Sequence, residues 1–226
     1  AERSGLARAL FGQGWGQVIP GAKGIALNIG SSGRITPGFE HVDRESIPGA
    51  NVRVCDIRLG LPYANESVEV AVCSHCLEHL HVAWELPAVL REVHRVLMPG
   101  GVFRVAVPDL AKLVAAYADG STDNAKALAS TQRESKEYIG TSYEDLPAAL
   151  RFSVIAYGNN SGAPYFDGHQ VCFDEEALKW TLLKAGFVDF AVVGPTESRH
   201  PTLLSRYRDV EAAEEIVVEC SKPEGS

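Results

Sequence analysis

Residues 61–109 read LPYANESVEVAVCSHCLEHLHVAWELPAVLREVHRVLMPGGVFRVAVPD, and this stretch decides the fold. Its first apolar, β-branched run, Val68–Cys73, predicts a strand buried on both faces of a parallel sheet. Apolar residues then recur at helical spacing over 86–97, and Pro99–Gly101 is expected to end that helix. A second apolar run, Val102–Val107, predicts the next strand. The stretch is therefore a strand–helix–strand unit of an α/β sheet.

Polar and ionisable residues follow the two strands of this unit. In an open parallel sheet, ligands bind beyond the carboxyl ends of the strands. That rule places the following residues at the working edge of the sheet: Ser74, His75, Glu78, Pro108 and Asp109.

Five further runs predict five more strands: Ile25–Ile29, Phe39–Asp43, Val52–Asp56, Phe187–Val193 and Ile216–Cys220. With the two strands above, the predicted sheet has seven. We expect the last two to pair antiparallel within a sheet that is otherwise mostly parallel. The segment 110–165 is expected to be a helical insertion after the fifth strand, serving as a lid, a substrate wall or plain scaffold. We predict a helix and connector over 1–24, a single domain over 25–220 and a tail over 221–226.

The connections between the first strands are short. Nine residues separate Gly33 from Asp43 and eight separate Asp43 from Val52, whereas a crossover that carries a helix needs about a dozen or more. Both crossovers must then be loops, and one face of the sheet lacks its usual helices. We expect the N-terminal helix, the insertion or a second subunit to cover that face.

Composition narrows the possible partners and compartments. The 226 residues are 46% hydrophobic, which is enough for one domain with a proper core. A net charge of −8 without a basic run argues against nucleic acid as a partner, and no apolar run approaches the roughly 20 residues of a membrane span. The first residues lack the apolar core of a secretory signal, and the five cysteines show no disulfide-rich pattern. These features predict a cytoplasmic protein.

The first three strands end in a Gly-rich turn and two acids. Glycine at 30 and 33 lets the backbone approach a ligand closely, and a carboxylate such as Asp43 can accept both hydroxyls of a ribose. A third strand that ends in Asp56 completes the outline of a nucleoside-binding edge. The alternative is that the glycines only make a turn and the two acids only cap loops.

Three quoted segments resemble the class I S-adenosylmethionine-dependent methyltransferases: LNIGSSGRITPGFEHVD, CDIRLGLPYANESVEVAVCSHCLEHL and LREVHRVLMPGGVFRVAVPD. The closest similarity is to a small type 11-like subgroup that has an LEHL signature and abbreviated early crossovers. HQVCFDEEALKWTLLKAGF is similar to the usual late helix and strand. The resemblance covers Ile25 to Cys220. It implies a Rossmann-like, doubly wound, seven-stranded sheet with an antiparallel last strand, and S-adenosylmethionine as the cofactor.

Carried over residue by residue, the resemblance implies these cofactor-binding positions: Asn28, Gly30, Ser31, Ser32, Asp43, Asp56, Ile57, Ser74 and His75. The turn would line the methionine part, Asp43 would hold the ribose, and Asp56 with Ile57 would contact adenine. Two positions depart from the family pattern. Asn28 replaces the acid that is common in the first strand, and Ser32 replaces the second glycine of the turn.

Methyl transfer requires the protein mainly to align the nucleophile and exclude water. A hydroxyl acceptor also profits from a general base whose pKa lies near the working pH, a role that suits histidine. His169, which follows the insertion, is the first catalytic candidate, and His75 and Asp109 come next. Each of the three has a simpler alternative as a structural hydrogen-bonding group.

The spacing Cys73-x2-Cys76-x2-His79-x-His81 resembles part of a zinc site. Cys73 ends a predicted buried strand, His79 belongs to the LEHL signature, and a second Cys-x2-Cys pair is absent. We therefore predict no metal and interpret the thiols as small core residues.

We predict an S-adenosylmethionine-dependent methyltransferase that acts on a small-molecule or glycan-type acceptor, by O-methylation, and that forms a possible homodimer. One rival is a non-catalytic binding module that keeps the fold, which the altered Gly-rich turn favours. The other is an NAD-dependent oxidoreductase. That class normally has Gly-x-Gly-x2-Gly and a full first crossover helix, and the chain shows neither.

Overall fold

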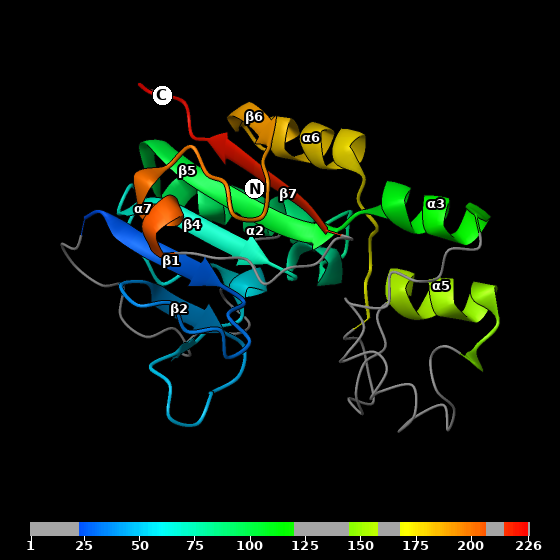
Figure 1. The fold of residues 1–226 in the computed structure, drawn as a ribbon. Coiled ribbons are helices and arrows are strands. Elements are labelled where there is room, and N and C mark those ends of the chain that lie inside the picture. The colour runs from blue at the N-terminus through cyan, green and yellow to red at the C-terminus, as the bar shows by residue number, and fades with distance from the viewer. Residues whose placement is uncertain (1–22, 120–144, 158–167, 207–214, 226) are drawn as a thin grey trace.

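The computed structural model describes residues 23–119, 145–157, 168–206 and 215–225 of the chain (Figure 1). The predicted N-terminal helix and much of the predicted insertion lie outside these residues.

The described residues form one seven-stranded sheet (Figure 1). Its strands are β1 (Ile25–Ile29), β2 (Glu40–Asp43), β3 (Arg53–Val54), β4 (Val68–Ser74), β5 (Leu97–Pro108), β6 (Val188–Val192) and β7 (Glu215–Ser221). Their order across the sheet is β3-β2-β1-β4-β5-β7-β6. The pairs from β3 to β5 are parallel, and β7 runs antiparallel to both β5 and β6. This topology confirms the predicted sheet, with β3 shorter than expected.

The helices are α2 (Glu85–Val96), α3 (Leu110–Asp119), α5 (Ala148–Tyr157), α6 (Glu175–Lys184) and α7 (Pro201–Arg206). Two short 3-10 helices, η1 (Ile57–Leu59) and η2 (Leu77–His79), follow β3 and β4. The larger hydrophobic core joins the sheet to apolar side chains that recur at helical spacing on α2 and α6: Leu86, Val89, Leu90, Val93, Val96, Leu178 and Leu182. Asp174 caps α6 by accepting a hydrogen bond from the amide of Ala177 at 2.8 Å.

The end of α2 differs from the sequence-based expectation. The helix stops at Val96, Leu97 is already extended, and Pro99–Gly101 lies inside β5. A side chain at Gly101 would meet the carbonyl oxygen of Met98 at 2.8 Å and that of Glu69 at 3.0 Å. The glycine therefore serves the close approach of β5 to its neighbour, and it does not serve as a helix terminator.

The second face of the sheet is covered by an element that the sequence analysis missed. Leu203 of α7 is buried in a separate apolar cluster with Ala26, Phe39, Val70 and Val72. The expectation named the N-terminal helix, the insertion or a second subunit for this face, and the N-terminal helix and much of the insertion lie outside the described residues. Among the described residues the six-residue α7 contributes, because it carries a leucine just after a loop that is tied to the sheet.

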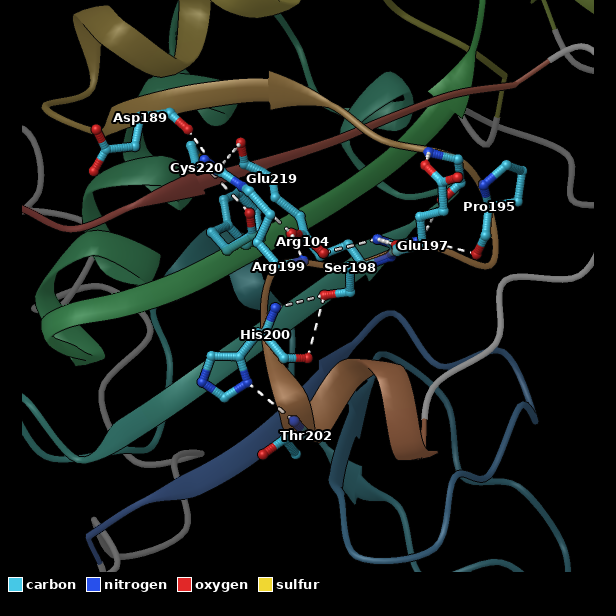
Figure 2. Close-up of polar contacts among 12 residues, drawn as sticks. Arg104, Asp189, Pro195, Glu197, Ser198, Arg199, His200, Thr202, Glu219 and Cys220 are labelled. Atoms are coloured by element: carbon cyan, nitrogen blue, oxygen red, sulfur yellow. Dashed lines mark hydrogen bonds and ion pairs between the residues drawn. The ribbon is translucent and has the colours of Figure 1, made fainter.

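That loop is held by a buried ion pair across β5 and β7 (Figure 2). The Arg104 guanidinium lies 2.8 Å from a carboxylate oxygen of Glu219, and it also donates to the carbonyl oxygens of Pro195 and Glu197 at 2.9 and 2.8 Å. The second oxygen of Glu219 accepts from the amide of Arg199 at 2.9 Å. These contacts place the start of α7 over the sheet.

Among the described residues, no helix has both the length and the apolar character needed to cross a membrane.

Candidate functional site

The turn after β1 requires glycine at its first position. Gly30 has φ +68°, and its amide donates to the carbonyl of Val42 at 2.9 Å. A Cβ at this position would meet both Cβ and Sγ of Cys76 at 3.0 Å. The backbone therefore passes directly over Cys76, which leads from β4 into η2.

We expect Gly30→Ala to cost about 2–4 kcal/mol of stability, because left-handed backbone strain and overpacking against Cys76 add together. Gly49→Ala is the matched control: φ is +80° there and nothing lies within 4 Å of the added Cβ. The control should cost about 1 kcal/mol. Urea unfolding of both variants measures the difference. Equal losses would show that the contact with Cys76 contributes nothing.

Asp43 ends β2 beside this turn. One carboxylate oxygen accepts from the amide of Ser32 at 2.7 Å, and the other accepts from the amide of Glu45 at 3.2 Å. Ser32 itself is strained, with φ +42°. The side chain of Ser31 is buried, and its hydroxyl has no hydrogen-bond partner. The edge thus offers a fixed carboxylate and an unpaired hydroxyl side by side.

Two further predicted residues stabilise the turn from within. Asn28 is 2% exposed and donates through Nδ2 to the carbonyl of Arg34 at 3.1 Å. Arg34 reaches the hydroxyl of Ser74, at the end of β4, with 3.5 Å between the two atoms. Asn28 and Ser74 thus tie the Gly-rich turn to the ends of β1 and β4.

Asp56 and Ile57 lie at the start of η1. The Asp56 carboxylate caps η1 by accepting from the amide of Arg58 at 3.1 Å, and the Arg58 guanidinium binds it at 2.6 Å. Burial alone would raise the pKa of Asp56, but the hydrogen bonds from Arg58 outweigh burial and lower that pKa below its ordinary value. The Ile57 side chain belongs to the core. The carboxylate therefore already has a partner at the place where adenine was expected.

A cluster of ionisable side chains lies beyond β4, and we call it the edge cluster: His75, Glu78, His79, His169 and Glu215. His75 has φ +52° and lies between two buried acids. Its Nδ1 is 3.3 Å from Glu78, and its Nε2 pairs with Glu215. Burial opposes the charge on His75, but hydrogen bonds to Glu215 and Glu78 outweigh burial and raise the pKa of His75 to about 10.

His169 joins this cluster from the chain that follows the insertion. Its Nδ1 lies 3.2 Å from the carbonyl oxygen of Ala156, so Nδ1 donates and Nε2 carries the lone pair. Burial lowers the pKa of His169 below its ordinary value, which leaves the ring neutral. Its ring meets that of His79 edge to face, with centroids 4.9 Å apart.

Asp109, the third catalytic candidate, has a local partner. It is 8% exposed, and its carboxylate accepts from the amide of Ala111 at 3.0 Å at the start of α3. The other oxygen lies 3.7 Å from the ammonium group of Lys112. These contacts are those of a helix cap.

A small pocket adjoins the edge cluster. Its volume of about 10 Å³ accommodates about one water molecule. Glu78 and His169 line it together with apolar and small side chains from β5, α3, α5 and the 171–172 segment: Pro108, Leu110, Leu113, Ala156, Val171 and Cys172.

The structure does not gather the cysteines and histidines whose spacing resembles a zinc site into one set of ligands. Cys73 is 1% exposed within the core, and His81 stacks on Trp84 with ring centroids 3.2 Å apart. Within the described residues, the side chains that approach as a set of possible metal ligands are Glu78, His79 and His169.

Sequence reasoning placed Glu78 at the working edge without a role and missed Glu215 altogether. The LEHL segment itself signals Glu78, since a carboxylate directly beyond a buried strand must find a partner or a ligand. No local signal points to Glu215, which lies 140 positions from its partner His75.

Comparisons with known proteins agree with this geometry. Residues 31–105 match a family model described as a methyltransferase domain. The match runs from the turn after β1 into β5, so it contains Asp43 and Glu78. A comparison with curated proteins finds no match.

Solved structures provide a second comparison. A SAM-dependent methyltransferase from Methanosarcina mazei is 18% identical with a TM-score of 0.52, over 92% of this chain and 99% of that one. A possible histamine N-methyltransferase from Thermotoga maritima is 19% identical with a TM-score of 0.46, over 90% and 84% of the two chains. A Burkholderia thailandensis 1,6-didemethyltoxoflavin-N1-methyltransferase, solved with S-adenosylhomocysteine, is 16% identical with a TM-score of 0.48, over 99% and 77%.

The chain shares the fold of the first of these structures, and its residues 31–105 match a methyltransferase domain.

Proposed function

We propose that the chain transfers a methyl group to an oxygen of a small-molecule acceptor that lies over the edge cluster. The observation that carries this proposal is the position of the Asp43 carboxylate. It lies beside the turn at Gly30, and this turn packs on Cys76, which leads into the edge cluster. Cys76 connects the two, because it packs under Gly30 and precedes the helix that holds Glu78.

The residues at the edge fit the cofactor. Gly30 gives the turn its left-handed backbone and its close packing on Cys76, and the buried hydroxyl of Ser31 lacks a partner that a polar ligand group could supply. Asp43 presents a fixed carboxylate that can accept hydrogen bonds from two ribose hydroxyls. When bound, S-adenosylmethionine supplies the methyl group together with its leaving group.

We propose His169 as the residue that acts on the acceptor oxygen. Its Nδ1 is bound to the carbonyl of Ala156, which leaves the lone pair of Nε2 available, and the ring lies beside Glu78 and His79. We assign no such action to His75, whose ring nitrogens both face carboxylates, or to Asp109, which caps α3.

His169→Ala is expected to lower turnover by about 100-fold or more, because the acceptor oxygen loses the group that polarises it. The dissociation constant for S-adenosylmethionine should not change, since His169 lies outside the Asp43 edge. Gln170→Ala, which removes the next side chain, is the control. Initial rates and calorimetric titrations make the comparison. Unchanged turnover in His169→Ala would end this assignment.

A ligand screen tests the proposed function against its rivals. Thermal-shift titration with S-adenosylmethionine should raise the melting temperature, and titration with NAD should leave it unchanged. A shift with NAD alone would favour an oxidoreductase, and a shift with neither ligand would favour a non-catalytic binding module.

Other features remain proposals that follow from the sequence. We propose a single domain over 25–220; much of the insertion at 110–165 lies outside the described residues. A glycan-type acceptor, a cytoplasmic location and a homodimer are parts of the same proposal. The five free cysteines support a reducing compartment.

A further inference from the structure

The buried carboxylate of Glu78 lacks a hydrogen-bond partner for one of its oxygens among the described residues. Its side chain is 1% exposed, and the oxygen without a partner is Oε2. Its near contact is the ion pair from one oxygen to Nδ1 of His75 at 3.3 Å. A buried carboxylate without full compensation is costly. The second oxygen therefore needs a cation or a hydrogen-bond donor, and the described side chains supply neither.

Two buried carboxylates converge on the ring of His75. Glu78 lies 3.3 Å from Nδ1, and Glu215 pairs with Nε2. Both ring nitrogens of His75 are thereby engaged, so His75 offers nothing to the second oxygen of Glu78.

Two imidazoles approach the same carboxylate. The ligand atoms of Glu78, His79 and His169 all lie within 4.8 Å of one another. In a tetrahedral site with bonds of about 2.0–2.1 Å, ligand atoms lie roughly 3.4 Å apart. The three atoms therefore exceed that spacing by at most about 1.4 Å (4.8 Å less 3.4 Å). Two histidines with one carboxylate form a donor set that suits divalent transition ions.

The backbone holds these three residues in place. The carbonyl of Glu78 accepts from the amides of Gln170 and Val171 at 2.7 and 3.2 Å, which joins η2 to the segment that carries His169. The amide of His169 donates to the carbonyl of Tyr157 at 2.6 Å. The contact from Nδ1 of His169 to Ala156 orients the ring as second-shell carbonyls orient metal-bound imidazoles.

We propose that Glu78, His79 and His169 bind one divalent ion of the first transition series, with open positions toward the adjoining pocket. This site differs from the cysteine–histidine spacing considered above and uses none of its thiols. Hard ions such as Mg²⁺ prefer all-oxygen sites and are excluded by the two imidazoles. The use of the ion, but not its binding, rests on the proposed function. In the metal-bound protein the ion polarises the acceptor oxygen, and His169 contributes as a ligand of the ion.

The test uses tag-free full-length protein that has been stripped with a chelator and dialysed. Titration with Co²⁺ should give visible absorption bands that saturate at one equivalent, and calorimetry with Zn²⁺ should show the same stoichiometry. Glu78→Gln and His169→Ala should each weaken binding by about 100-fold or more, because even outer-shell changes cost about 10–100-fold. His200→Ala, which removes a histidine on the other side of β4, should bind as wild type.

Circular dichroism establishes that each variant is folded, and His79→Ala provides a third ligand variant if one of the others fails to fold. Absence of binding, or equal binding in wild type and ligand variants, overturns the metal site. If the stripped protein transfers methyl groups at a rate that added Zn²⁺ does not change, the use of the ion is overturned. The proposed function then still stands. One-equivalent binding without any methyl transfer supports the site and counts against the proposed function.

Discussion

Replacing Asp43 by alanine is expected to weaken S-adenosylmethionine binding by at least about 100-fold. Each hydrogen bond from a ribose hydroxyl to a carboxylate is worth about 1.5–3 kcal/mol, and the variant loses two of them. It also releases the amides of Ser32 and Glu45, which the carboxylate holds at 2.7 and 3.2 Å. The Gly-rich turn should then lose its fixed position, which adds to the loss of affinity.

Two further variants separate these contributions. Asp43→Asn keeps the shape and one acceptor oxygen but removes the charge, so we expect a loss of about 10-fold. Glu45→Ala changes the exposed acid of the same loop and should leave the affinity unaltered. Isothermal titration calorimetry gives the dissociation constants. If Asp43→Ala binds S-adenosylmethionine as tightly as wild type, the carboxylate of Asp43 does not hold the ribose.

The largest effect on stability is expected at the ion pair between β5 and β7. The side chains of Arg104 and Glu219 are 3% and 0% exposed, and two of their atoms lie 2.8 Å apart (Figure 2). Glu219→Ala leaves the guanidinium buried without its counter-charge, which costs about 3–5 kcal/mol. The loop at 194–200 should loosen as well, because Glu219 also holds the amide of Arg199.

A double variant and a surface pair provide the controls. Arg104→Met combined with Glu219→Met should cost less than Glu219→Ala alone, since no unpaired charge remains buried. Arg44→Ala breaks an exposed pair with Glu45 and should change stability by less than about 1 kcal/mol. Urea unfolding measures all three variants. A loss below about 1 kcal/mol in Glu219→Ala would mean that water or another cation replaces the partner.

The sheet could be predicted because its signals are local. Buried strands such as β1 and β4 appear in the sequence as apolar runs, and the short spacing between Gly33 and Asp43 correctly predicts loops in place of crossover helices. The topology with an antiparallel β7 follows from the polar connection that precedes it.

Features that depend on distant pairs could not be predicted in the same way. Glu215 lies at the start of β7 and meets His75 only after the sheet has formed. Arg104 and Glu219 were in principle detectable, because each is a lone charge within an apolar strand and the two are direct neighbours in the β5–β7 register. Leu203 covers the sheet from a helix of six residues, too short to show a periodic pattern.

A crystal structure of the protein with S-adenosylhomocysteine tests the central claim most directly. We predict a nucleoside across the carboxyl ends of β1 and β2, with both ribose hydroxyls on the carboxylate of Asp43 and the sulfur directed toward the edge cluster. A nucleoside bound elsewhere, or an Asp43 carboxylate that makes no contact with it, would contradict the account.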